Sequence, residues 1–128
     1  IQDRPWLGHG SGTATDVILK NRGEKKGSPN PHNDYLKIAL EYGLMGLAVY
    51  LYLLAAVLWR LWKQYRQEDR NDLKTLYLGI FALTLSLFIM SFGDNMIRNT
   101  ALQWTLWSLI GGTLALSCKK HNKKAPSV

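Results

Sequence analysis

Cysteine is nearly absent from this sequence, and its scarcity excludes two classes of small protein. The single cysteine, Cys118, cannot form an internal disulfide, and no Cys-x-x-Cys or Cys/His spacing typical of a zinc site occurs. A disulfide-stapled secreted domain and a zinc module are therefore ruled out, and we expect neither a metal nor another cofactor. With 128 residues the chain is one domain or part of one. Because it begins at Ile1 and not at Met, we expect a piece of a longer protein or a processed product.

Charged residues are absent from three long stretches, although the whole chain has a net charge of +7. A basic chain ordinarily suggests nucleic-acid binding. Nucleic-acid-binding proteins place that charge on a folded face, however, whereas this chain keeps it out of its apolar stretches. The same stretches argue against a transporter, because transporters hold functional polar or ionisable residues inside their membrane spans.

The three charge-free stretches cover residues 43–59, 75–93 and 100–117. A transmembrane helix needs roughly 20 apolar residues, and apolar neighbours extend the first stretch to 43–62. The alternative is a soluble bundle of three buried helices. Each helix of such a bundle should show a polar stripe, and a chain this short cannot bury three all-apolar helices. The sequence therefore predicts an all-α integral membrane protein with three transmembrane helices.

The positions of Lys and Arg predict how these helices are oriented. Five basic residues lie between the first two charge-free stretches, namely Arg60 and four residues within 63–74. Four more lie in the tail 118–128. The turn 94–99 holds only Arg98. Basic loops face the cytoplasm, so residues 1–42 and 94–99 are expected outside. Six basic residues within 1–42 depart from this rule, but a basic external loop suits an anionic substrate.

The outer segment is expected to hold the chemistry. Residues 1–30 are predicted to form a loop, in which Gly8, Gly10 and Gly12 make either a phosphate cradle or a turn without a ligand. Asn30 and Pro31 suit the cap and first position of a surface helix over 31–42.

That helix start gives two polar residues a distinctive environment. His32 and Asn33 would lie in the first turn, where the dipole attracts anions and disfavours an imidazolium. His32 is then able to accept a proton, although a capping-region histidine without a catalytic role remains the alternative. At the other end of the helix, Gly43 and Gly46 allow a bend or close helix packing.

One motif resembles a known family. His32 and Asn33, followed by nine residues and then Gly43-Leu-Met-Gly46, match the His-Asn-x9-Gly-x-x-Gly motif of the O-antigen ligase and O-antigen polymerase-like membrane glycosyltransferases. The segment PHNDYLKIALEYGLMGL is similar to that family's consensus pattern HNxYLxxxxExGxxGL, including the glutamate at Glu41. RPWLGHGSGT is similar to its PLLGxGxG turn, with His9 where a small apolar residue is commoner.

The resemblance implies a fold, a location and a reaction. The chain would be the periplasmic loop, short helix and last three transmembrane helices of a larger polytopic GT-C-type fold in the bacterial inner membrane, with its active face periplasmic. The reaction is a metal-independent, inverting transfer of a polysaccharide from undecaprenyl diphosphate to a sugar hydroxyl, on lipid A-core or on another glycan. Polymerase, protein O-oligosaccharyltransferase and non-catalytic membrane fragment remain alternatives to ligase.

The resemblance also assigns roles to residues. His32 matches the family's general base. The family holds the diphosphate with arginines of its outer loop, for which Arg4, Arg22 and Arg98 are candidates by location only. Asn33 is a candidate substrate-binding residue through its place in the motif, and Gly43 and Gly46 are structural.

The orientation can be tested by labelling. In a Cys118→Ser background, a cysteine placed at Ser28 should react with a membrane-impermeant maleimide added outside the cell, and one placed at Gln67 should not. The reason is the excess of Lys and Arg on the segment next to Gln67. The opposite labelling pattern would invert the orientation.

Overall fold

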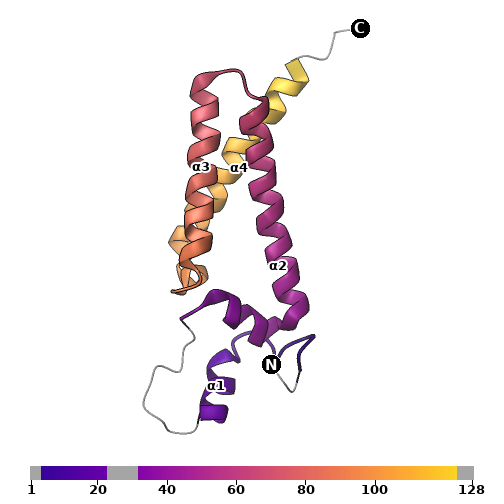
Figure 1. Ribbon diagram of the computed structural model, residues 1–128, viewed down its shortest axis with the longest axis vertical. Helices are drawn as coiled ribbons and strands as arrows, with labels where there is room; N and C mark the ends of the chain where they lie inside the picture. The colour runs from indigo at the N-terminus through magenta and orange to yellow at the C-terminus, as the bar shows by residue number, and fades with distance from the viewer. Residues whose placement is uncertain (1–3, 23–31, 124–128) are drawn as a thin grey trace.

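The described part of the chain is helical throughout. The computed structural model describes residues 4–22 and 32–123 (Figure 1). Within these residues there is no strand, and the elements follow one another as α1 (Ala14–Arg22), α2 (Asp34–Gln67), α3 (Asn71–Met90), the 3₁₀ turn η1 (Met96–Arg98) and α4 (Thr100–Lys123). The all-α class predicted from the sequence is confirmed.

Helix α2 consists of two helical segments joined at Gly43. Gly43 has φ 70° and ψ −171°, outside the helical region and in a part of backbone space that only glycine enters easily. The first segment, 34–42, lies across the end of the molecule, and the second, 44–67, rises alongside α3 (Figure 1). Gly43 thus makes the bend that the glycine spacing allowed. Gly46 lies beside Tyr42, whose Cβ would overlap any side chain at position 46.

A loop before α1 supplies the hydrogen bonds that the bend removes. In an unbroken helix the N–H groups of Leu44 and Met45 would bond the carbonyls of Leu40 and Glu41. Instead, Leu44 N–H donates to the Pro5 carbonyl at 2.8 Å and Met45 N–H to the Trp6 carbonyl at 3.4 Å. The freed carbonyls of Leu40 and Glu41 accept from the N–H groups of His9 and Gly10, at 3.0 and 2.9 Å. We call residues 5–10 the clamp loop.

Helices α2 and α3 are each long and apolar enough to cross a membrane. Only 11% and 17% of their most apolar windows are buried, whereas the core helix of a soluble protein is mostly buried. Within the described residues α4 does not pass the same test, because Gln103 and several Thr and Ser residues dilute its apolar ones. The third span therefore stays a prediction.

The core joins α4 to the α2–α3 pair. Leu61, Tyr77, Ile80, Leu106 and Ile110 form one buried cluster. Leu106 and Ile110 are four residues apart and so lie on one face of α4. This packing brings the chain back after α3, so that the turn between α3 and α4 lies beside the start of α2 (Figure 1).

The structure moves several predicted boundaries in the outer region. Residues 14–22, predicted as loop, form α1, whose Thr, Val and Ile residues have low helix propensity and gave no clear signal. The surface helix begins at Asp34, not at Pro31, because Asn33 is its N-cap and its side-chain oxygen accepts from Leu36 N–H at 3.0 Å. His32 and Asn33 thus precede the first turn. Asn30 and Pro31 lie outside the described residues.

The connection between α2 and α3, predicted to be a cytoplasmic loop, is shorter than expected. Helix α2 continues to Gln67 and α3 begins at Asn71, so only Glu68–Arg70 connects them where 63–74 was expected. Arg, Lys and Gln residues end an apolar run without ending a helix, since their helix propensity is high. Helix α3 ends at Met90, three residues before the predicted end of the second span at 93.

The bend at Gly43 predicts that replacing this glycine by alanine destabilises the protein more than the same change at another helix glycine. Gly43→Ala should lower the free energy of unfolding by at least ~2 kcal/mol, because alanine is strained at this φ and its Cβ would overlap the Trp6 carbonyl. Gly79→Ala is the control, since no atom lies within 4 Å of its added Cβ. Thermal unfolding of the purified protein in detergent measures both, and equal melting temperatures would contradict the clamp.

Candidate functional site

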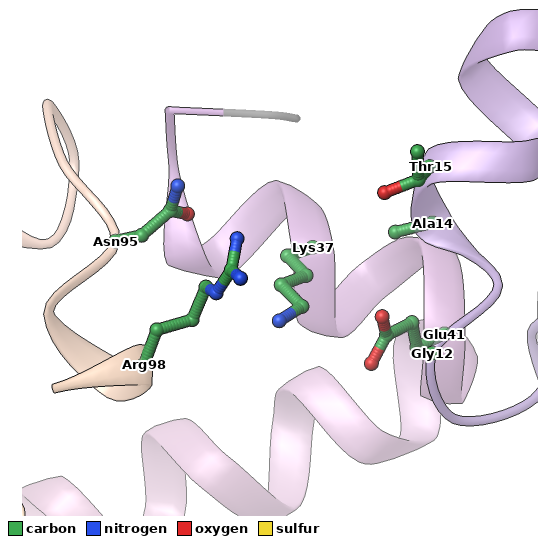
Figure 2. Close-up of a pocket in the computed structure, with 7 residues that line it drawn as sticks. All are labelled: Gly12, Ala14, Thr15, Lys37, Glu41, Asn95 and Arg98. Carbon is green, nitrogen blue, oxygen red and sulfur yellow. The ribbon is translucent and has the colours of Figure 1, made fainter. Parts of the chain in front are cut away.

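A polar cleft of about 220 Å³ lies where three parts of the outer region meet (Figure 2). The surface segment of α2 forms its floor, the start of α1 forms one wall and the turn around η1 forms the other. Its lining residues are Gly12, Ala14, Thr15, Lys37, Glu41, Asn95 and Arg98.

Asp34 holds the η1 turn against the start of α2. Its backbone N–H donates to the Ser91 carbonyl at 3.0 Å, and its Oδ2 accepts from Ile97 N–H at 2.9 Å. The side chain is fully buried, and its Oδ1 has no hydrogen-bond partner among the described residues. Since Ile97 precedes Arg98, this contact fixes one wall of the cleft. Asp34 was not singled out from the sequence and appeared there only as a letter of the motif.

Tyr35 makes a second connection to the end of α3. Its hydroxyl donates to the Phe88 carbonyl at 2.6 Å. Its ring packs against Phe92 and Phe88, with centroid distances of 4.3 and 5.4 Å. Asp34 and Tyr35 together bind the surface segment of α2 to the turn that follows α3.

His32, the predicted base, lies at the same end of the molecule but outside the cleft lining. It is exposed and precedes the Asp34 contact by two residues. His32 and Arg98 therefore flank the hydrogen bond between Asp34 and Ile97. Asn33 is engaged through its Oδ1 in capping α2, so its role in substrate binding stays a prediction.

Among the three candidate arginines, Arg98 is one that lines the cleft. Its guanidinium extends from η1 toward Lys37 (Figure 2). Arg4 is exposed in the chain before the clamp loop, where its carbonyl accepts from Gly8 N–H. Arg22 is the last residue of α1. Arg4 does not belong to the cleft lining, and the side chain of Arg22 lies outside the described part of the structure.

Two cleft residues were not proposed as site residues from the sequence. Lys37 and Glu41 are four residues apart on a helix, so their side chains share one face. Glu41 entered only as a letter of the motif, yet it is 6% exposed and faces the cleft (Figure 2). The four-residue spacing was the available signal, but the walls that complete the cleft come from distant segments.

Comparison with known proteins agrees with the resemblance read from the motif. Residues 1–51 match the family model of the O-antigen ligases. The matched residues contain the clamp loop, α1, His32, the surface segment of α2 and both motif glycines. This confirms the resemblance for the outer region. Together with the two apolar helices, it identifies the chain as a membrane protein.

One curated relative extends the match beyond this region. The chain is 25% identical over 95 residues to the teichuronic acid biosynthesis protein TuaE of Bacillus subtilis (strain 168), which is 74% of this chain. The chain spans only 19% of that relative's length. No solved structure matches the chain.

Removal of the Asp34 side chain should destabilise the contact between the η1 turn and the start of α2. Asp34→Ala leaves Ile97 N–H without its acceptor, so we expect a loss of about 1–3 kcal/mol in the free energy of unfolding. Asp34→Asn keeps an acceptor oxygen and should lose less. Asp72→Ala, at an exposed acid in the first turn of α3, is the control. Denaturation in detergent would contradict the assignment if Asp34→Ala were no less stable than this control.

Proposed function

We propose that this chain carries the outer-face site of a bacterial inner-membrane glycosyltransferase. The enzyme moves a glycan from undecaprenyl diphosphate to a sugar hydroxyl at the periplasmic face, as an O-antigen ligase does. The main support is that the Asp34–Ile97 hydrogen bond brings a candidate base, His32, and a cleft with two cations to one end of the helices. The family match over residues 1–51 supports the same reaction class.

The proposed reaction needs a proton acceptor and positive charge. The acceptor hydroxyl attacks the anomeric carbon from the side opposite the diphosphate, and His32 takes the hydroxyl proton. The bond between the anomeric carbon and the phosphate oxygen breaks, and the lipid diphosphate leaves with the bonding electrons. Arg98 and Lys37 stabilise the charge that gathers on its oxygens. A guanidinium can bind two phosphate oxygens at once, which makes Arg98 the main ligand. This mechanism inverts the anomeric configuration and uses no metal.

A lipid-linked substrate also needs an apolar surface next to the polar site. The surface segment of α2 has such a surface on its other side, where Ile38 and Tyr42 border a groove of about 540 Å³. The groove continues along α2 past Met45 and Val49 and is bordered by Trp107 of α4. One short helix thus separates a polar cleft from an apolar groove, an arrangement that suits an amphiphilic donor.

The acceptor has two candidates. The family description favours a ligase that attaches the glycan to lipid A-core. The relative's name refers to teichuronic acid biosynthesis, and we keep a polymerase whose acceptor is another glycan as the second candidate. Both reactions use the same donor chemistry at the cleft.

The assignment of His32 predicts a large loss of transfer. In cells that express the protein, His32→Ala should lower glycan transfer by roughly 10²-fold or more, because general-base catalysis contributes that much. His9→Ala is the matched control: it removes the contact of the His9 ring Nδ1 with the Leu40 carbonyl at 3.2 Å but keeps the backbone hydrogen bond from His9 N–H to the same carbonyl. The readout is the amount of transferred glycan relative to protein in the membrane. Near-normal transfer by a well-expressed His32→Ala protein would exclude this role.

A further inference from the structure

Glu41 places a carboxylate in the cleft. The residue is 6% exposed, and its side chain extends into the cleft from the floor (Figure 2). No hydrogen bond or ion pair to this carboxylate is found within the described residues. Its oxygens open onto the cleft, because neither is among the fully buried polar atoms that lack a partner. A ligand that enters the cleft and donates hydrogen bonds can therefore reach the carboxylate.

The polar side chains of the cleft lie in a fixed order from one end to the other, with the cations and the carboxylate apart. Asn95 and Arg98 lie at one end, Thr15 and Glu41 at the other, and Lys37 between them (Figure 2). With two cations and one carboxylate, the lining side chains carry a net positive charge. A ligand that fits this order has an anionic end facing Arg98 and hydroxyl groups facing Glu41.

The size of the cleft limits the ligand further. About 220 Å³ is less than the roughly 300–1,000 Å³ of sites that enclose a drug-sized molecule. The cleft has room for one sugar ring with part of a diphosphate, but not for a lipid chain. A diphosphate alone would bring its negative charge toward Glu41, whereas a sugar hydroxyl would donate to it.

We propose, building on the function proposed above, that the cleft binds the diphosphate-linked sugar of the donor and that Glu41 is a specificity-determining residue. Its carboxylate accepts hydrogen bonds from hydroxyls of that sugar. Lys37 and Arg98 face the phosphates. Glu41 therefore distinguishes a sugar diphosphate from a bare lipid diphosphate, while Arg98 serves both.

A binding experiment with two kinds of probe separates these roles. The intact protein in nanodiscs is titrated with farnesyl diphosphate and with farnesyl diphosphate linked to N-acetylglucosamine, glucose, galactose or glucuronic acid. At least one sugar-bearing probe should bind more tightly than farnesyl diphosphate. Glu41→Gln should lower the affinity for that probe about 10-fold, which corresponds to the loss of one charge-assisted hydrogen bond. The same change should alter the affinity for farnesyl diphosphate less than about twofold. Arg98→Lys should weaken both kinds of probe.

The controls keep the result interpretable. Glu68→Gln replaces another buried glutamate, at the far end of α2, and should leave both affinities unchanged. Unchanged binding of farnesyl diphosphate by Glu41→Gln reports an intact cleft. If glutamine is not accommodated, Glu41→Asp keeps the charge and should retain more of the sugar preference than Glu41→Ala.

Two outcomes would overturn the role of Glu41. One is that no sugar-bearing probe binds more tightly than farnesyl diphosphate. The other is that Glu41→Gln affects both kinds of probe equally or leaves the sugar preference intact. Either result would leave the transferase proposal standing, because that depends on His32 and on glycan transfer. Conversely, if His32→Ala keeps normal transfer while the sugar preference depends on Glu41, the site stands and the proposed mechanism falls.

Discussion

The bend of α2 at Gly43 is the constraint on which the outer region depends. A break in a helix leaves N–H and carbonyl groups without partners, and next to a membrane such groups cannot be left unpaired. The clamp loop replaces the missing partners one for one, with the N–H groups of His9 and Gly10 on one side of the break and the carbonyls of Pro5 and Trp6 on the other. Because Gly8 and Gly43 lack side chains, the two backbones can come close enough for this exchange.

The bend lets one continuous helix serve two purposes. Beyond Gly43 it runs alongside α3 and carries the apolar surface of a membrane span. Before Gly43 it lies across the end of the helices, where it forms the floor of the cleft (Figures 1 and 2). A straight α2 would direct Lys37 and Glu41 away from the η1 turn, so the polar residues would meet no walls. The site therefore follows from a backbone feature as much as from its side chains.

The sequence predicted the apolar helices, because the absence of charge over a long stretch is a local property. It did not predict where they end, since residues 60–67 stay helical after the apolar run stops. The start of the surface helix was misplaced because Asn30 and Asn33 can both cap a helix, and local sequence does not decide between them. The bend was within reach of the sequence through the glycine spacing, but the clamp loop as its partner was not.

Glu41 illustrates why the cleft itself could not be derived from sequence. Its spacing from Lys37 is visible, but its place beside Gly12 and the start of α1 depends on a segment that is distant in sequence. The same residue also belongs to the clamp, since its carbonyl accepts from Gly10 N–H and lies against Gly8. The backbone of Glu41 is thus fixed by the contact that stabilises the bend, while its carboxylate faces the cleft. Asp34 fixes the opposite wall through its side chain, so hydrogen bonds within the protein hold both walls of the cleft. Preorganisation of this kind lowers the entropy lost on binding, so the proposed recognition of a donor would depend on the bend.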